Sequence, residues 1–128
     1  MKVLLDTHTF LWYVEDAPQI SASALEIIND GDNEVFFSMA SAWEIAIKFG
    51  LGKLQLPAPF EEFIARQTKL NDFEWLEISL HHISILPTLP QHHRDPFDRL
   101  LVAQAQSENL IILSADVALN AYDIARRW

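Results

Sequence analysis

The fold is decided by two stretches, Lys2-Val3-Leu4-Leu5-Asp6 at the start of the chain and Leu110-Ile111-Ile112-Leu113-Ser114-Ala115-Asp116 near its end. In each, a short apolar run is closed by polar residues, which is typical of a strand buried on both faces. Buried strands of this kind favour a parallel sheet over an antiparallel sheet with one wet face. We therefore predict strands at 2–5 and 110–113 within a parallel sheet.

Helical and strand patterns alternate between these two runs. Further strands are predicted at 34–38 and 73–78, and the ambiguous final residues, 124–128, suggest a last edge strand. Helices are predicted at 7–15, 21–29, 39–49, 60–70, 80–86, 96–108 and 117–122. Residues 39–49 are apolar nearly all round, which predicts a buried helix. Asp95 precedes Pro96 and is placed to cap the helix that follows. The alternation predicts an α/β fold with helices on both faces of the sheet.

Length and composition limit the possible functions. The chain has 128 residues, half of them hydrophobic, and we expect a single domain over residues 1–128. It has no cysteine, which excludes disulfides, thiolate metal sites and a cysteine nucleophile. The net charge of -9 argues against a basic face that coats nucleic acid. Neither a signal peptide nor a membrane span is indicated, so we expect a cytoplasmic protein.

Four acidic residues are candidates for chemistry. Asp6 and Asp116 follow the two decisive runs, and ligands of parallel sheets bind at the carboxyl ends of strands. Glu44 is the one acid within the apolar segment 39–49, and Asp98 lies in the first turn of the helix that begins near Pro96. Four carboxylates at one sheet edge would repel without compensation. Such a set suits Mg²⁺ or Mn²⁺, which can promote attack of water on a phosphodiester.

Each of these acids also has a purely structural explanation. Asp6 and Asp116 are placed to cap helices, a role that contributes about 1 kcal/mol. Glu44 has Lys48 four residues on, in the favoured orientation for a helical ion pair. Asp98 is an ordinary first-turn acid, favoured by the helix dipole. The sequence alone leaves both explanations open for each residue.

Four segments, in this order and spacing, resemble the PIN-domain family, and specifically the VapC-type toxins of bacterial toxin–antitoxin modules. The resemblance extends over essentially the whole chain. The segments are Leu4-Leu5-Asp6-Thr7-His8, Ser41-Ala42-Trp43-Glu44-Ile45-Ala46-Ile47-Lys48, His93-Arg94-Asp95-Pro96-Phe97-Asp98-Arg99-Leu100-Leu101 and Leu113-Ser114-Ala115-Asp116.

The resemblance implies a three-layer α/β/α domain with a parallel sheet of about five strands, and a metal-dependent endoribonuclease. The family's acidic positions correspond to Asp6, Glu44, Asp98 and Asp116, as catalytic residues and as ligands of Mg²⁺ (or Mn²⁺). Thr7 matches the family's hydroxyl after the first aspartate, expected to help hold the metal or its water. The products implied are 5′-phosphate and 3′-hydroxyl ends.

The partners implied by the resemblance are an RNA substrate and a small antitoxin, with a homodimer and a toxin–antitoxin hetero-oligomer expected. Contacts to RNA phosphates are predicted for Lys48, Arg94 and Arg99, with Arg99 favoured because it adjoins Asp98. Lys53 is a weaker candidate of the same kind. Because positive charge is scarce, we expect recognition through RNA shape and unpaired bases.

Two other functions remain open at this point. One is a non-catalytic PIN-like module that binds antitoxin or RNA and holds a structural cation. The other is a metal-free ribonuclease that uses histidine as acid and base and leaves a cyclic phosphate. The later histidines form two adjacent pairs, His81-His82 and His92-His93, for which we expect loop or surface positions.

Overall fold

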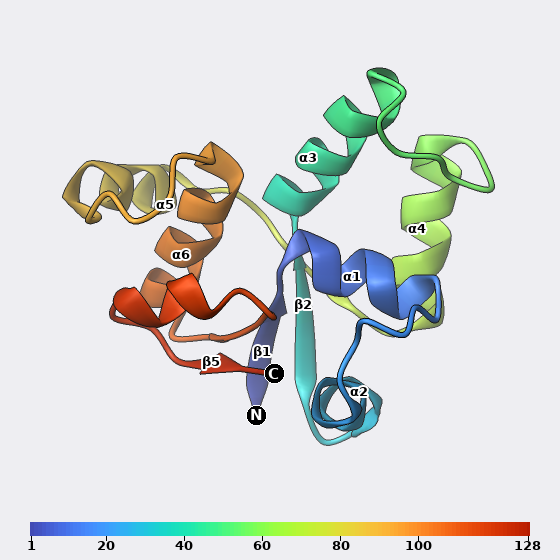
Figure 1. Ribbon diagram of the computed structural model, residues 1–128, viewed down its shortest axis with the longest axis horizontal. Coiled ribbons are helices and arrows are strands. Elements are labelled where there is room, and N and C mark those ends of the chain that lie inside the picture. The colour runs from blue at the N-terminus through green and yellow to red at the C-terminus, as the bar shows by residue number, and fades with distance from the viewer.

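The computed structural model describes all 128 residues and contains a five-stranded parallel sheet in the order β3-β2-β1-β4-β5 (Figure 1). Every pair of neighbouring strands is parallel, as predicted. The strands are β1 (Lys2–Leu5), β2 (Glu34–Ser38), β3 (Glu74–Leu76), β4 (Ile111–Leu113) and β5 (Arg126–Arg127).

The helices lie on both sides of the sheet (Figure 1). They are α1 (Thr7–Val14), α2 (Ala22–Asn29), α3 (Met39–Gly50), α4 (Phe60–Leu70), α5 (Leu80–Ile85) and α6 (Pro96–Glu108), with 3₁₀ helices η1 (Leu86–Thr88) and η2 (Val117–Ala121). All predicted helices are present. The predicted helix at 117–122 is a 3₁₀ helix, and the predicted strand at 73–78 is reduced to the three residues of β3. None of the helices is both long and apolar enough to cross a membrane.

The sheet separates two hydrophobic cores because successive strand residues point to opposite faces. Val3 and Leu5 pack into the core beneath α1, α2 and α4, whereas Leu4 packs into the core beneath α6. All three side chains are completely buried. The result is the predicted three-layer α/β/α arrangement.

The central strand β1 is the switch point of the sheet. From β1 the chain adds β2 and β3 on one side and then returns to add β4 and β5 on the other. Leu5 pairs with Leu113, so the residues after these two strands emerge side by side at the carboxyl edge. Ligands of open parallel sheets bind at such an edge. Asp6 and Ser114 are those residues.

The prediction that the helix at 39–49 is buried was wrong for one of its faces. Ile45 and Ala40 are completely buried, but Trp43 is 56% exposed and Ile47 is 40% exposed. This apolar outer face of α3, together with α5 and α6, borders an open groove of about 500 Å³. The side chains that line it are Trp43, Ile47, Ile78, Ile83, Leu86, Pro96, Phe97 and Leu100.

Candidate active site

Asp6 occupies the turn between β1 and α1, and its carboxylate is held at both oxygens. Oδ1 accepts a hydrogen bond of 2.8 Å from the backbone N–H of Thr9, which makes Asp6 the N-cap of α1. Oδ2 accepts a hydrogen bond from the hydroxyl of Ser114, at the end of β4. Ser114 also accepts a bond of 3.0 Å from the N–H of Asp116. One buried hydroxyl therefore links the two aspartates of the central strands.

Glu44 reaches the same edge from the buried side of α3. Its side chain is 6% exposed, and its two oxygens have different partners. Oε1 accepts a hydrogen bond of 2.6 Å from the hydroxyl of Thr7, and Oε2 lies 2.7 Å from the Lys48 ammonium. The Ser41 hydroxyl lies 3.0 Å from that of Thr7. This network compensates a buried charge and fixes the orientation of the Glu44 carboxylate.

Asp98 differs from the other acids because its carboxylate has no hydrogen-bond partner. Asp95 caps α6 by accepting bonds from the N–H groups of Phe97 and Asp98, with Pro96 at the first helical position, as predicted. The cap leaves the Asp98 side chain free, half-buried in the first turn.

Electrostatics place Asp98 among the other acids. Burial, together with the negative charges of Asp95, Glu44 and Asp6, raises the pKa of Asp98 to about 6, against an opposing effect of His93. Trp43 and Phe97, in edge-to-face contact with centroids 5.1 Å apart, join α3 to the start of α6. Asp6, Glu44 and Asp98, from three separate elements, therefore act on one another at one edge of the sheet.

Asp116 is held by a histidine that the sequence did not indicate. His93 Nε2 lies 2.7 Å from Asp116 Oδ2, and His93 Nδ1 lies 3.0 Å from the Tyr122 hydroxyl. Burial alone would raise the pKa of Asp116. Hydrogen bonds from His93 and the N–H of Ala118, with the charges of His93 and Arg126, hold the pKa of Asp116 below its ordinary value.

The expectation of loop or surface positions was wrong for His82, which is buried on α5, whereas His93 lies in the loop before α6, as expected, with its side chain largely buried. His82 is 2% exposed, and its Nε2 lies 2.9 Å from Glu108 Oε1. The side chain of His93 is 10% exposed. His81 and His92 are exposed, as expected. For His93 the sequence carries no local signal, because its partners Asp116 and Tyr122 lie more than 20 residues away. His82 also has a local partner, since its Nδ1 accepts a hydrogen bond from the backbone N–H of Ser79 in a capping box.

The predicted RNA contacts have different surroundings. Lys48 lies at the site, paired with Glu44, and Arg94 is exposed. Arg99 points elsewhere: its guanidinium donates to the carbonyls of Pro90, Leu86 and Leu89, which anchors the loop before α6. That position gives no support to Arg99 as an RNA ligand.

The chemistry of the acids fits a hard divalent cation. Carboxylate oxygens are the ligands that Mg²⁺ and Mn²⁺ prefer, and mutual repulsion at Asp98 is what a cation would relieve. The side chains do not form a preassembled group of three or more acidic or histidine ligands. Asp6, Glu44 and Asp116 accept hydrogen bonds, and each carboxylate keeps further lone pairs with which it could bind a cation.

A model of the PIN domain family matches residues 3–125. The chain belongs to the PIN domain family. This PIN domain is 41% identical over 51 residues to Ribonuclease VapC16 of Mycobacterium tuberculosis (strain ATCC 25618 / H37Rv). The match spans 37% of this chain and 36% of that relative, so little more than a third of either is compared.

Solved structures share the fold of this PIN domain at low sequence identity. VapBC2 from Rickettsia felis, bound to a DNA fragment from their promoter, matches with a TM-score of 0.74 and 14% identity over 100% of this chain and 99% of that one. VapBC-1 from nontypeable Haemophilus influenzae matches with a TM-score of 0.67 and 19% identity over 99% of this chain and 97% of that one. The resemblance to the PIN-domain family and the fold inferred from sequence are confirmed.

Proposed function

We propose that this PIN domain is a metal-dependent endoribonuclease that hydrolyses RNA phosphodiesters and serves as the toxin of a toxin–antitoxin pair. The observation that carries the proposal is the Asp98 carboxylate, which has no hydrogen-bond partner and lies within electrostatic reach of Asp6 and Glu44. Membership of the PIN family and the likeness to Ribonuclease VapC16 support the reaction class.

Asp6, Glu44, Asp98 and Asp116 would hold Mg²⁺ or Mn²⁺. When bound, the ion would lower the pKa of an attacking water and stabilise negative charge on the phosphate. The chain's own residues set the geometry: Thr7 orients Glu44 by its hydrogen bond, and Ser114 ties Asp6 to the backbone of Asp116. Attack of water at the phosphorus, with the bond to the 3′ oxygen breaking, would leave products with 5′-phosphate and 3′-hydroxyl ends.

The test is cleavage of total cellular RNA by purified protein free of antitoxin. We expect discrete fragments with 5′-phosphate ends in Mg²⁺ or Mn²⁺, and none in EDTA or with Asp98→Asn. Glu108→Gln is the matched control because Glu108 lies at the far end of α6 and contacts His82. Cleavage that survives both EDTA and Asp98→Asn would contradict the proposal, and cyclic-phosphate ends would indicate the histidine mechanism.

We further propose a small antitoxin as the protein partner, with assembly into a homodimer and a toxin–antitoxin hetero-oligomer. Support comes from the solved VapBC structures that share this fold. Co-expression with the adjacent gene, followed by mass measurement in solution, tests the assembly. A protein that stays monomeric, and that no neighbouring gene product binds or inhibits, would leave a non-catalytic or stand-alone PIN module as the better description.

A further inference from the structure

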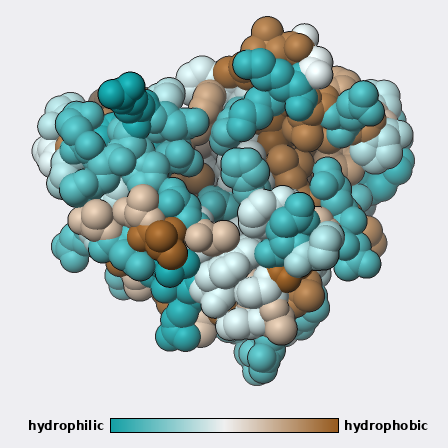
Figure 2. Space-filling model, in the orientation of Figure 1, coloured by the Kyte–Doolittle hydropathy of each residue, from teal (hydrophilic) through white to brown (hydrophobic).

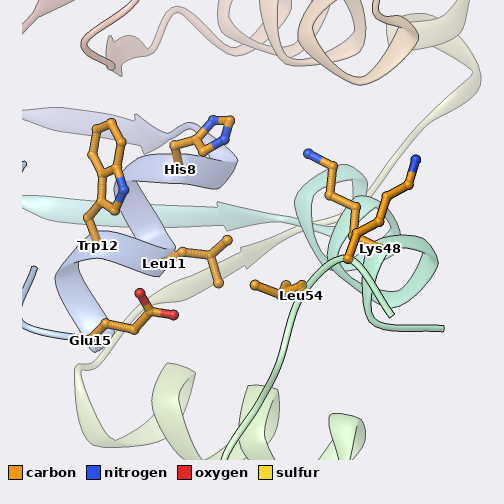
Figure 3. Close-up of a pocket in the computed structure, with 7 residues that line it drawn as sticks. His8, Leu11, Trp12, Glu15, Lys48 and Leu54 are labelled. Carbon is orange, nitrogen blue, oxygen red and sulfur yellow. The ribbon is translucent and has the colours of Figure 1, made fainter. Parts of the chain in front are cut away.

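A cavity of about 340 Å³ lies beside the acidic edge, between α1, α3 and the segment after α3. It is lined by His8, Leu11, Trp12, Glu15, Lys48, Lys53 and Leu54 (Figure 3). In the orientation of Figure 1, the surface view shows a brown, apolar hollow in this region with hydrophilic residues around it (Figure 2). The cavity therefore combines an apolar floor with a polar rim.

Aromatic rings form one wall of this cavity. His8 and Trp12 lie one turn apart on α1 with ring centroids 5.7 Å apart, and Trp128 packs against Trp12 at 5.9 Å. Figure 3 shows the rings of His8 and Trp12 above Leu11, with Leu54 on the other side of the space. An accessible aromatic wall over an aliphatic floor suits a flat, aromatic ligand.

Cations form the opposite wall. Lys48 lies across the cavity from His8 and Trp12 (Figure 3). Lys53 also lines the cavity, is exposed, and makes no ion pair in the structure. Glu15, the acid of this set, lies on the far side of Leu11 from His8 (Figure 3). Lys53 therefore supplies positive charge for an anion such as a phosphate, whereas the Lys48 ammonium is shared with Glu44.

The cavity and the acidic edge share residues. Lys48 lines the cavity and lies 2.7 Å from Glu44 Oε2. His8 directly follows Thr7, whose hydroxyl donates to Glu44 Oε1. A ligand in the cavity would therefore extend directly to the candidate catalytic carboxylates.

We propose that this cavity binds an unpaired nucleobase of the RNA substrate, stacked against Trp12 and His8, with the adjoining phosphate held by Lys48 and Lys53. This inference rests on the proposed function, because it places a base next to the bond to be cut. In a chain of net charge -9, stacking supplies affinity that a general basic surface would otherwise provide. Unpaired bases stacked on aromatic side chains are the usual basis of single-strand recognition.

The test is a double-mutant cycle in which Trp12 is substituted in the protein and single bases are removed from the RNA. The probes are four fluorescein-labelled single-stranded RNA octamers, each built from one of the four bases. A second set of the same octamers lacks the base at a single position, and each position is tested in turn. Binding is measured by anisotropy in EDTA with Asp98→Asn proteins, so that the RNA stays intact. Trp12→Ala should weaken binding about tenfold or more, and Trp12→Phe should restore most of it. His8→Ala and Lys53→Ala should also weaken it.

Trp43→Ala is the matched control, because Trp43 is an exposed tryptophan in the separate groove, and it should bind as tightly as the parent. At one position of the octamer, removal of the base should weaken binding to the parent protein. The same removal should not weaken binding to Trp12→Ala, because that variant has already lost the stacking contact. Equal abasic penalties in both proteins, or no binding of any octamer at millimolar protein, would overturn the inference. If Trp12→Ala does not unfold cooperatively, and so is not properly folded, His8→Ala replaces it in the cycle, because His8 is exposed and its substitution leaves the core intact.

Two outcomes distinguish failure of this inference from failure of the proposed nuclease function. Normal RNA binding by Trp12→Ala with loss of antitoxin binding would assign the cavity to the protein partner and overturn the nucleobase inference. Conversely, wild-type protein that cleaves no RNA yet shows the predicted coupling between Trp12 and one base would contradict the nuclease proposal and leave the binding site intact.

Discussion

His93 Nε2 lies 2.7 Å from Asp116 Oδ2 across 23 residues of sequence, and the other ring nitrogen lies 3.0 Å from the Tyr122 hydroxyl. In the tautomer with the proton on Nε2, His93 donates to Asp116 and accepts from Tyr122. The histidine thereby limits the orientations open to the carboxylate. Groups that orient a metal ligand commonly contribute a factor of 10 to 100 to metal affinity.

His93→Ala should therefore weaken Mn²⁺ binding by about tenfold, measured by electron paramagnetic resonance or calorimetry, and should slow RNA cleavage. His92→Ala is the control, because His92 is exposed and its ring contacts Tyr122 but no acid in the site. Identical Mn²⁺ affinities for the two variants would show that His93 does not position Asp116.

Asp98 should make the stability of the metal-free protein depend on pH. The ordinary pKa of 3.8 applies in the unfolded chain, and burial with neighbouring negative charges raises the native pKa to about 6. Between these values the native state binds more protons than the unfolded state, so stability falls as pH rises through the window. At pH values above the native pKa of about 6, Asp98 is ionised in both states and its destabilising effect on the native state reaches its full size.

The measurement is the difference in Tm between Asp98→Asn and wild type in EDTA, from pH 4 to pH 8. The variant lacks the ionisable group, so it should be the more stable protein at pH 7, with the difference vanishing toward pH 4. Addition of Mg²⁺ at pH 7 should raise the Tm of wild type more than that of Asp98→Asn. A difference that does not change with pH would refute the placement of Asp98 among the acids.

Thr7→Val should destabilise the protein and reduce cleavage. Thr7 is 4% exposed and donates to Glu44 Oε1, so its removal leaves a buried carboxylate oxygen without that donor. The expected loss is about 1–3 kcal/mol in the free energy of unfolding. Thr7→Ser keeps the hydroxyl and should retain most of the activity. The two free energies come from urea titrations, and equal values would show that the hydroxyl contributes nothing.

Substitutions of Arg99 and Arg94 should have different effects on stability, because Arg99 anchors a loop and Arg94 lies on the surface. Arg99→Ala removes hydrogen bonds to the carbonyls of Leu86, Leu89 and Pro90 and should cost about 1–3 kcal/mol in the free energy of unfolding. Arg94 is exposed and makes no hydrogen bond, so Arg94→Ala should leave stability unchanged and weaken RNA binding if Arg94 contacts phosphate. Arg99→Ala that folds with full stability but binds RNA poorly would reverse these roles.

Much of this protein follows from local sequence. Apolar runs and helical spacing identify the elements, and the predictions at 2–5, 34–38, 60–70 and 96–108 agree with the structure to the residue. The positions of Asp6 and Asp116 after strands follow from the same patterns. The cap formed by Asp95 and the Glu44–Lys48 pair are also local, because their partners lie within four residues.

The tertiary structure decided which residues meet at the acidic edge. Ser114 meets Asp6, and Thr7 meets Glu44, because the sheet order places β1 between β2 and β4. Periodicity reports burial on average but not the neighbour, so it missed His93 as the partner of Asp116. It likewise predicted burial of α3 on every side, whereas Trp43 and Ile47 on its outer face are exposed. Contacts between distant segments depend on packing of the complete fold, which no local pattern contains.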